Sequence, residues 1–405
     1  MAVTPSRARL GISLQFFTNG ALMGTLLPHY PQIKDTFELS NAVFGLLVVA
    51  FPVGSLLTAA FAGRAIRRFG ALTTATVLTV TLAVLLAVAV SSPWLWLLFV
   101  GLLLAGCADP VLDAAQNVHG LRVERALGRS VINSMHAIWS LGAVTGGLVG
   151  AWTAGLGLRV GPVMVGAGLV WSALAVLAWW LGRLPEAEEC PAATEHHARP
   201  TRAGALLLVA PVAVLAVAGT LVEEVGNSWA TLYARDVTGA APGVAGLAYV
   251  TAYAAQFVGR ITGDRLTDRF GRGEVAVAGG VLIALGGLVV MVAPTVLVVL
   301  AGFVLLGLGC ATLVPAAFAA AHELPGLAYG TGVALVGWIM RGGFVLTSPL
   351  LGAIADRWGL RAGMVLPLLA GVVAVFVAAR LRRPRQAAAS GASRAGAPAT
   401  PDTSA

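Results

Sequence analysis

Several carboxyl, amide and imidazole side chains of this 405-residue chain fall within long apolar runs. Asp109, Asp113 and Asn117 are four residues apart, so a helix places all three on one face. Other apolar runs carry similar polar stripes at spacings of three or four residues, namely Gln15 with Asn19, His136 with Ser140, Tyr249 with Tyr253, and Trp338 with Arg341. Because such groups are costly to surround with hydrocarbon, we interpret the stripes as the lining of one central cavity for a polar solute or a proton.

The overall composition indicates which kind of protein holds these groups. Apolar residues make up 58% of the chain and charged residues 11%, whereas about a quarter of the residues of a soluble domain are charged. Twelve continuous apolar runs are long enough to cross a hydrocarbon core of roughly 30 Å as helices, at residues 10–28, 42–62, 72–91, 95–116, 131–154, 161–182, 204–224, 243–262, 275–292, 296–319, 328–351 and 362–380. We therefore predict an all-α membrane protein with twelve transmembrane helices in the lipid bilayer.

The second half of the chain repeats the plan of the first half. Two charged segments between apolar runs match each other, GRAIRRFG at 63–70 and GDRLTDRFGR at 263–272. We read both as short hairpins, and we predict two pseudo-symmetric six-helix bundles at residues 1–182 and 204–382. A cytoplasmic linker at 183–203 joins the bundles, and a disordered cytoplasmic tail follows at 383–405. Cys190, His196 and His197 of the linker indicate a solvated connector more than a metal site, so no metal is expected.

The basic residues predict the orientation. With the N-terminus inside, five of the 26 basic residues lie on the outer side and Arg341 lies within a span, which leaves 20 for the cytoplasmic side. This asymmetry follows the positive-inside rule. The basic residues are scattered over short loops, so no nucleic acid is expected as a partner. With Lys34 as its only lysine, the composition is typical of a GC-rich bacterial gene, and we expect a multi-pass protein of the bacterial cytoplasmic membrane with both termini in the cytoplasm.

Twelve spans in a 6+6 repeat, with charged segments after the second and eighth spans, resemble the major facilitator superfamily. The pattern G-x-x-x-D-R-x-G-R of that family recurs in part after both spans, at Gly63, Arg68 and Gly70 and at Asp268, Arg269, Gly271 and Arg272. Arg67 stands where the first copy should have its acid, and Asp264 stands where the second copy should have its first glycine. The resemblance implies a gate in which Asp268 lies against a helix N-terminus of the neighbouring bundle. The segment GAIADRWG at 352–359 resembles the family's ending of the eleventh span.

Two further segments narrow the resemblance. GCADPVLDAAQN at 106–117 resembles the fourth span of fucose-permease-like proton symporters, and EEVGNSWATLYARD at 223–236 looks like a bacterial subgroup distantly related to them. By this resemblance Asp113 would carry a proton and Glu223 would be the acid that opens the seventh span. Those permeases also have an acid in the first span, where this chain has Leu27, so their substrate is not carried over.

We therefore expect a secondary active transporter of a small polar solute that works by alternating access with proton coupling, without a cofactor other than the proton gradient. The candidate proton-coupling residues are Asp113, Asp109 and Glu223. The candidate substrate contacts are Asn19, His136, Ser140, Tyr249, Tyr253, Trp338 and Arg341. Simpler alternatives stay open: Arg341 neutralises Glu223 or Asp109 as a structural pair, Asp113 pairs with Arg122 or Arg129 at the cytoplasmic surface, and His136 is a packing residue.

Two other functions remain as alternatives. The first is proton-driven efflux of drugs or metabolites, because Gly142–Ala151 resembles an antiporter motif without its proline, although helix packing also explains these glycines. The second is a transport-inactive membrane sensor or scaffold. The sequence shows no catalytic nucleophile on facing spans, so we do not expect an enzyme. We expect a monomer whose partners are a small-molecule substrate and the bilayer.

Overall fold

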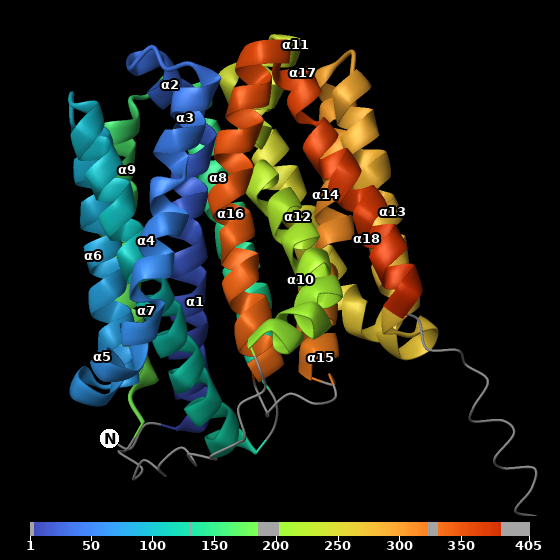
Figure 1. The fold of residues 1–405 in the computed structure, drawn as a ribbon. Helices are drawn as coiled ribbons and strands as arrows, with labels where there is room; N and C mark the ends of the chain where they lie inside the picture. The colour runs from blue at the N-terminus through green and yellow to red at the C-terminus, as the bar shows by residue number, and fades with distance from the viewer. Residues whose placement is uncertain (1–3, 129–130, 185–201, 323, 325–330, 382–405) are drawn as a thin grey trace, which may run out of the picture.

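The computed structural model describes residues 4–128, 131–184, 202–322, 324 and 331–381. In this part of the chain all regular structure is helical (Figure 1). Eleven helical segments are long and apolar enough to cross a membrane, and the 29-residue helix α12 (Pro242–Phe270) covers the predicted run at 243–262. The prediction of an all-α membrane protein is confirmed. The predicted linker and tail lie almost entirely outside the described residues.

The N-terminal half holds the first nine α-helices, which are α1 (Pro5–Leu26), α2 (Tyr30–Thr36), α3 (Asn41–Val48), α4 (Ala50–Thr58), α5 (Ala62–Phe69), α6 (Ala71–Ser91), α7 (Leu95–Leu127), α8 (Ile132–Gly155) and α9 (Val160–Gly182). The C-terminal half holds α10 (Arg202–Glu224), α11 (Ala230–Thr238), α12, α13 (Arg272–Val292), α14 (Val296–Cys310), α15 (Leu313–His322), α16 (Thr331–Trp358), α17 (Leu360–Gly363) and α18 (Val365–Leu381). Following the predicted orientation, we call the end of the molecule with α2, α11 and α17 the outer end, which is at the top of Figure 1.

Three helical segments extend well beyond the runs from which they were predicted. One continuous segment runs over Pro5–Thr36, and α7 ends at Leu127 rather than near residue 116. The segment that begins with α10 continues through a π-helical turn, Val225–Trp229, into α11. Apolar runs reveal the part of a helix that lies in hydrocarbon, whereas the helix itself continues into polar surroundings. The helix therefore continues well past residue 224, where the predicted span ends.

Single glycines turn the chain where the two halves repeat. Gly70 (φ 79°) separates α5 from α6, and Gly271 (φ 92°) separates α12 from α13. Left-handed backbone of this kind costs little for glycine, since it has no Cβ. Gly157 (φ 71°) and Gly359 (φ 85°) form a second matched pair at the outer end. The repeat is thus present in the backbone, and each segment read as a hairpin is a helix end, one glycine and a helix start.

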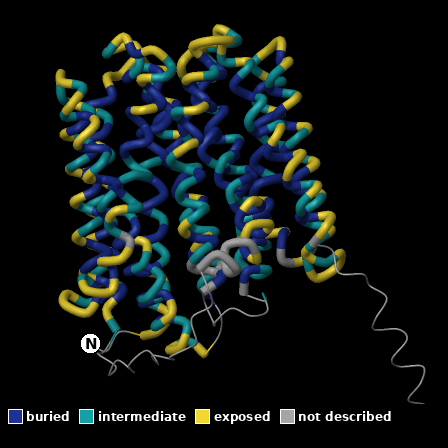
Figure 2. The backbone as a smooth tube through the Cα atoms, in the orientation of Figure 1, coloured by how far each residue is buried: buried dark blue, intermediate teal, exposed yellow. Residues whose placement is uncertain are grey.

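Apolar side chains cover both the core and the periphery. Leu297, Leu169 and Leu346 are at least 69% exposed on outward faces, as expected of a surface that faces lipid rather than water. The buried residues lie along the inner faces of the helices (Figure 2). At the contact of α1 with α8, a Cβ at Gly142 would overlap the carbonyl of Phe17. Small residues therefore let these helices approach closely, which supports the packing interpretation of this glycine-rich segment.

Candidate functional site: a cavity between the two halves

A cavity of about 350 Å³ lies where the two halves meet, and it is large enough for a small organic solute. The N-terminal half contributes residues of α1, α2, α3, α4, α7 and α8 to its wall. The C-terminal half contributes residues of α10, the π turn, α12 and α16. Its polar and ionisable lining residues include Asn19, Ser55, Asp109, Asp113, Glu223, Glu224, Asn227, Ser228, Tyr249, Tyr253 and Arg341.

Helix α7 brings two carboxyl groups to the cavity. Asp109 and Asp113 are one helical turn apart, and both line the wall. Asn117 Nδ2, one turn further along α7, donates to Asp113 Oδ1 at 3.2 Å. His136 Nε2 of α8 lies 3.1 Å from Asn117 Oδ1. Asp113 thus faces the cavity, and of its two alternative partners Arg129 lies outside the described residues. His136 lies behind Asn117 and off the cavity wall.

Arg341 of α16 supplies a positive charge from the opposite half. It interacts electrostatically with both Asp109 and Asp113. Its own hydrogen bond runs from Nη1 to the carbonyl oxygen of Gly337, at 3.2 Å. The ion pairs of the described residues do not include Arg341. The guanidinium therefore attracts two carboxyl groups across the cavity. Its other N–H groups remain available to a solute in the cavity.

Amide and aromatic groups line the cavity on either side of these charges. Asn19 Nδ2 donates to Gln116 Oε1 at 3.3 Å. On α12, the rings of Tyr249 and Tyr253 are 4.7 Å apart, and the Tyr253 hydroxyl donates to Asn227 Oδ1 at 2.5 Å. The ring centroids of Trp139 and Tyr253 are 6.1 Å apart. The wall thus offers donors, acceptors and ring faces, the groups that bind polar solutes.

The remaining predicted residues lie beside the cavity or away from it. The Ser140 hydroxyl is buried and accepts from Arg260 Nη1 at 3.1 Å, and Arg260 also pairs with Glu223 at 3.6 Å. Arg260 thereby joins α8 of one half to α10 of the other. The side chain of Trp338 is 68% exposed and is not part of the cavity lining. The spacing that groups Trp338 with Arg341 does not show which of the two residues lines the cavity.

The residues predicted to bind substrate or carry protons do not include four lining residues, Glu224, Asn227, Ser228 and Tyr30. Glu224 and Asn227 follow Thr220 and Glu223 at helical spacing, a polar stripe that the sequence predicts to face the cavity, but the apolar run of this span ends at residue 224. Tyr30 lies past the predicted end of the first span at residue 28. The apolar runs that end at residues 28 and 224 do not show that their helical segments continue to Thr36 and Thr238. Among the described residues, no cluster of three or more His, Cys, Asp or Glu side chains could hold a metal ion.

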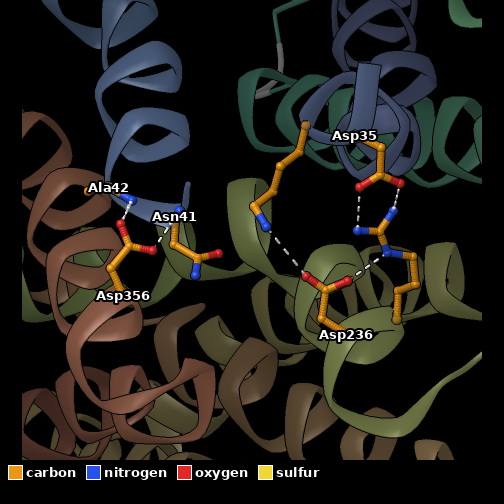
Figure 3. Close-up of polar contacts among 7 residues, drawn as sticks. Asp35, Asn41, Ala42, Asp236 and Asp356 are labelled. Carbon is orange, nitrogen blue, oxygen red and sulfur yellow. Dashed lines mark hydrogen bonds and ion pairs between the residues drawn. The ribbon is translucent and has the colours of Figure 1, made fainter. Parts of the chain in front are cut away.

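The outer end of the cavity is closed by contacts between the halves (Figure 3). Asp356, near the end of α16, accepts hydrogen bonds from the backbone N–H groups of Asn41 and Ala42, both at 2.8 Å. These N–H groups open α3, so the carboxylate lies at a helix N-terminus, where negative charge is favourable. A Cβ at Gly45 of α3 would also overlap the carbonyl oxygen of Ser348 of α16. Helices α3 and α16 are therefore held together at the outer end.

A charged network closes the outer end next to this contact (Figure 3). Arg235 of α11 binds both carboxylate oxygens of Asp35 in α2, with Nη2 at 3.0 Å from Oδ1. Arg235 Nε also donates to Asp236 Oδ1 at 2.7 Å, and Lys34 Nζ lies 3.7 Å from Asp236 Oδ2. Two residues of each half thus take part in one network of alternating charge.

The candidate gate residues lie at the opposite end. Gly63 and Arg68 belong to α5, and the Arg68 guanidinium lies over the Phe69 ring at 5.4 Å. Arg269 repeats this contact over Phe270, at 5.1 Å. Asp268 is exposed, and the described part of the chain gives it no hydrogen-bond or ion-pair partner. Arg272 begins α13 after the turn at Gly271.

Another acid, Glu124, accepts hydrogen bonds at the start of helix α8. Glu124 Oε2 of α7 accepts from the backbone N–H groups of Val131 and Ile132, at 2.7 and 3.2 Å, where α8 begins. Helix α8 packs against α12, which carries Asp268. A contact of the kind expected for Asp268, between an acid and a helix N-terminus, is made at the outer end by Asp356.

Comparison with known families decides the family of the chain. The family model for the Major Facilitator Superfamily matches residues 12–239 and 212–403. The chain belongs to the major facilitator superfamily. A superfamily relative from Sinorhizobium fredii, an uncharacterized transporter named y4wD, is 29% identical over 385 residues, which cover 92% of this chain and 97% of the relative. The membrane protein MosC of Rhizobium meliloti is 25% identical over 366 residues, covering 89% of this chain and 87% of that protein.

Solved structures of other superfamily members share the fold. The nucleoside transporter NupG aligns with a TM-score of 0.68 over 93% of this chain and 97% of its own, at 13% identity. A bacterial homolog of the human lysosomal transporter Spinster, in an inward-facing and occupied conformation, aligns with a TM-score of 0.69 at 16% identity, over 92% of this chain and 96% of its own. The 405-residue chain, as a member of the same superfamily, is an integral multi-pass membrane transporter of small molecules and not an enzyme.

Proposed function

We propose that the transporter moves a small polar solute by alternating access, driven by protons. The observation that carries the proposal is the 350 Å³ cavity, in which Asp109 and Asp113 of one half face Arg341 of the other. A solute bound there contacts both halves, so its binding can depend on how they are placed. The closed outer end supports an inward-facing state as the one described.

Proton coupling is supported by the position of the carboxyl groups. A charged side chain within a membrane-spanning helix is costly, and binding a proton removes the charge. Asp113 lines the cavity, and its chain of contacts through Asn117 leads to His136, which can also exchange protons. Arg341 can attract either the deprotonated carboxyl groups or an anionic part of the solute, and a close contact with one of them weakens its contact with the other. Competition for Arg341 would couple the solute to the proton.

The proposal extends to the setting of the protein. We propose that it works as a monomer in the bacterial cytoplasmic membrane, with its N-terminus in the cytoplasm. The excess of basic residues at the end opposite α2 and α11 supports this orientation.

The test starts with a panel of polar solutes scored by thermal stabilisation of the purified protein. Stabilising solutes are then tested for uptake into proteoliposomes with and without a pH gradient. We expect uphill uptake only with the gradient, and Asp113→Asn should abolish uphill uptake while solute exchange across the membrane continues. Glu38→Gln, an exposed acid remote from the cavity, is the matched control. If the unmodified protein takes up the solute at the same rate and to the same level with and without the pH gradient, proton coupling is ruled out.

A further inference from the structure

Glu224 is a buried acid that the proposed function does not use. Its side chain is 6% exposed, it lines the cavity, and it is the last residue of α10 before the π turn. Single π turns within α-helices often occur at functional sites. Here the turn places Ser228 so that its Oγ donates to Glu224 Oε1 at 2.7 Å. The local backbone thus supplies one donor to the carboxyl group.

Helix α16 supplies a second donor to the same oxygen. Ser348 Oγ donates to Glu224 Oε1 at 2.6 Å, and Trp229 Nε1 donates to Ser348 Oγ at 3.0 Å. An indole N–H can only donate, so Ser348 accepts from Trp229 and uses its own proton for Glu224. The donors therefore run in one direction and end at the carboxyl group. Such an arrangement is strongest when its acceptor is negatively charged.

Among the described residues, the charge of Glu224 is stabilised by these hydrogen bonds and not by an ion pair. The titratable groups that interact with it are Glu223, its neighbour in α10, and Tyr30 of α2. The π turn and α16 present neutral donors, Ser228 and Ser348. Within the described residues Glu224 takes part in no ion pair, whereas Glu223 pairs with Arg260. A proton that binds Glu224 would therefore remove the charge that organises the donors.

Ser348 links this acid to the outer closure. Its hydroxyl binds Glu224, while its carbonyl oxygen packs against Gly45 of α3 so closely that no Cβ fits between them. A shift of Ser348 along or around α16 would change the contact with α3. The link runs from an acid of the cavity to the contact that closes the outer end.

We propose that Glu224 is the residue through which proton binding opens the outer end of the transporter. Deprotonated Glu224 holds Ser348 and keeps α16 against α3. The protonated carboxyl group binds the two serine donors less strongly and releases α16. The proton is taken from water in the cavity and returns to it. This inference rests on the proposed function, and it gives Glu224 the coupling role expected for Glu223.

The experiment measures the outer closure directly and needs no substrate. Cys107, Cys190 and Cys310 are replaced, and spin labels are attached at Thr36→Cys in α2 and Arg357→Cys in α16, both exposed at the outer end. Distances between the labels are recorded in lipid nanodiscs from mildly alkaline to mildly acidic pH, above the range in which exposed aspartates titrate. We expect the open population to rise about tenfold towards acidic pH, because the charge-assisted hydrogen bond that Ser348 of α16 donates to Glu224 is weakened.

Three variants decide the role of Glu224. Glu224→Gln should keep the open population at its raised, acidic-pH level at every pH and so remove the pH response. Ser348→Ala should raise the open population and reduce the response, and it keeps the acid in place if Glu224→Gln fails to fold. Thr347→Val is the matched control, because Thr347 is also buried on α16 but donates to the Gly343 carbonyl of its own helix. It should keep the full response.

The opposite results overturn the inference. A pH response that persists in both Glu224→Gln and Ser348→Ala would exclude Glu224, and so would a parent protein whose label distances do not change with pH. Loss of the response in Glu223→Gln but not in Glu224→Gln would move the role to Glu223. Failure of the proposed function is a separate result, since it is the absence of gradient-driven uptake in proteoliposomes and not a label distance.

Discussion

Replacing Asp356 by asparagine should weaken the outer closure by a measurable amount. The carboxylate accepts two backbone hydrogen bonds at the N-terminus of α3, both 2.8 Å long. Loss of a side-chain cap at a helix N-terminus costs about 1 kcal/mol. Asparagine keeps one acceptor oxygen but loses the charge, and the charge at a helix N-terminus contributes about 0.3–1 kcal/mol. Since Asp356 is exposed, we expect a total of about 1 kcal/mol, which is about a fivefold change in population.

The assay follows access to the cavity from the outer side. Met23 lines the cavity, so Met23→Cys in a protein without its native cysteines reports opening. A membrane-impermeant maleimide added outside reacts in proportion to the open population when that population is small. Asp356→Asn should therefore raise the labelling rate about fivefold.

The control for this experiment is another acid close to the same helix. Glu38 is exposed three residues before Asn41, and its carboxylate makes no hydrogen bond in the described part of the chain. Glu38→Gln should leave the labelling rate unchanged. If Asp356→Asn reacts at the rate of this control, the contact with α3 does not hold the outer end closed, and the reasoning from helix capping is refuted.

Three further predictions concern contacts of the same structure. Arg235→Gln should raise labelling of Met23→Cys in low salt and have little effect in high salt, because exposed ion pairs are screened; an equal effect in both would contradict an electrostatic role. Gly45→Ala should raise the same labelling rate, since the added Cβ would overlap the Ser348 carbonyl, and an unchanged rate would show that the helices adjust. Gln15→Leu should lower stability by about 1 kcal/mol in thermal unfolding in detergent, because buried Gln15 donates to Thr76 and to the Ala175 carbonyl, whereas Thr18→Val, which removes a bond within α1, should cost less.

The sequence predicts the fold well because the bilayer restricts it. A helix that crosses hydrocarbon must be apolar over a known length, so the runs locate the spans even where helices continue further. The turns at Gly70 and Gly271 are legible because a positive φ favours glycine strongly. Helix ends outside the hydrocarbon have no such constraint, and this is why the extensions to Thr36, Leu127 and Thr238 were missed.

The site is predictable only where residues share a helix face. Asp109 and Asp113 lie together in the cavity because a spacing of four fixes their common direction. The same argument groups Trp338 with Arg341, yet Trp338 is exposed and is not part of the cavity lining, since sequence does not show which neighbours α16 meets. Contacts such as that of Ser348 with Glu224 join residues 124 positions apart, and no local pattern encodes them.

The closure made by Asp35, Arg235, Asp236 and Lys34 lies at the surface of the molecule. Ions of the surrounding medium reach such groups, and at physiological ionic strength they screen charges over about 8 Å. The balance between closed and open outer ends therefore depends on the salinity of the compartment that this end faces. In the proposed orientation, a cell that moves from dilute to salty surroundings would shift the balance between the closed and open outer end of the transporter without any change in its substrate.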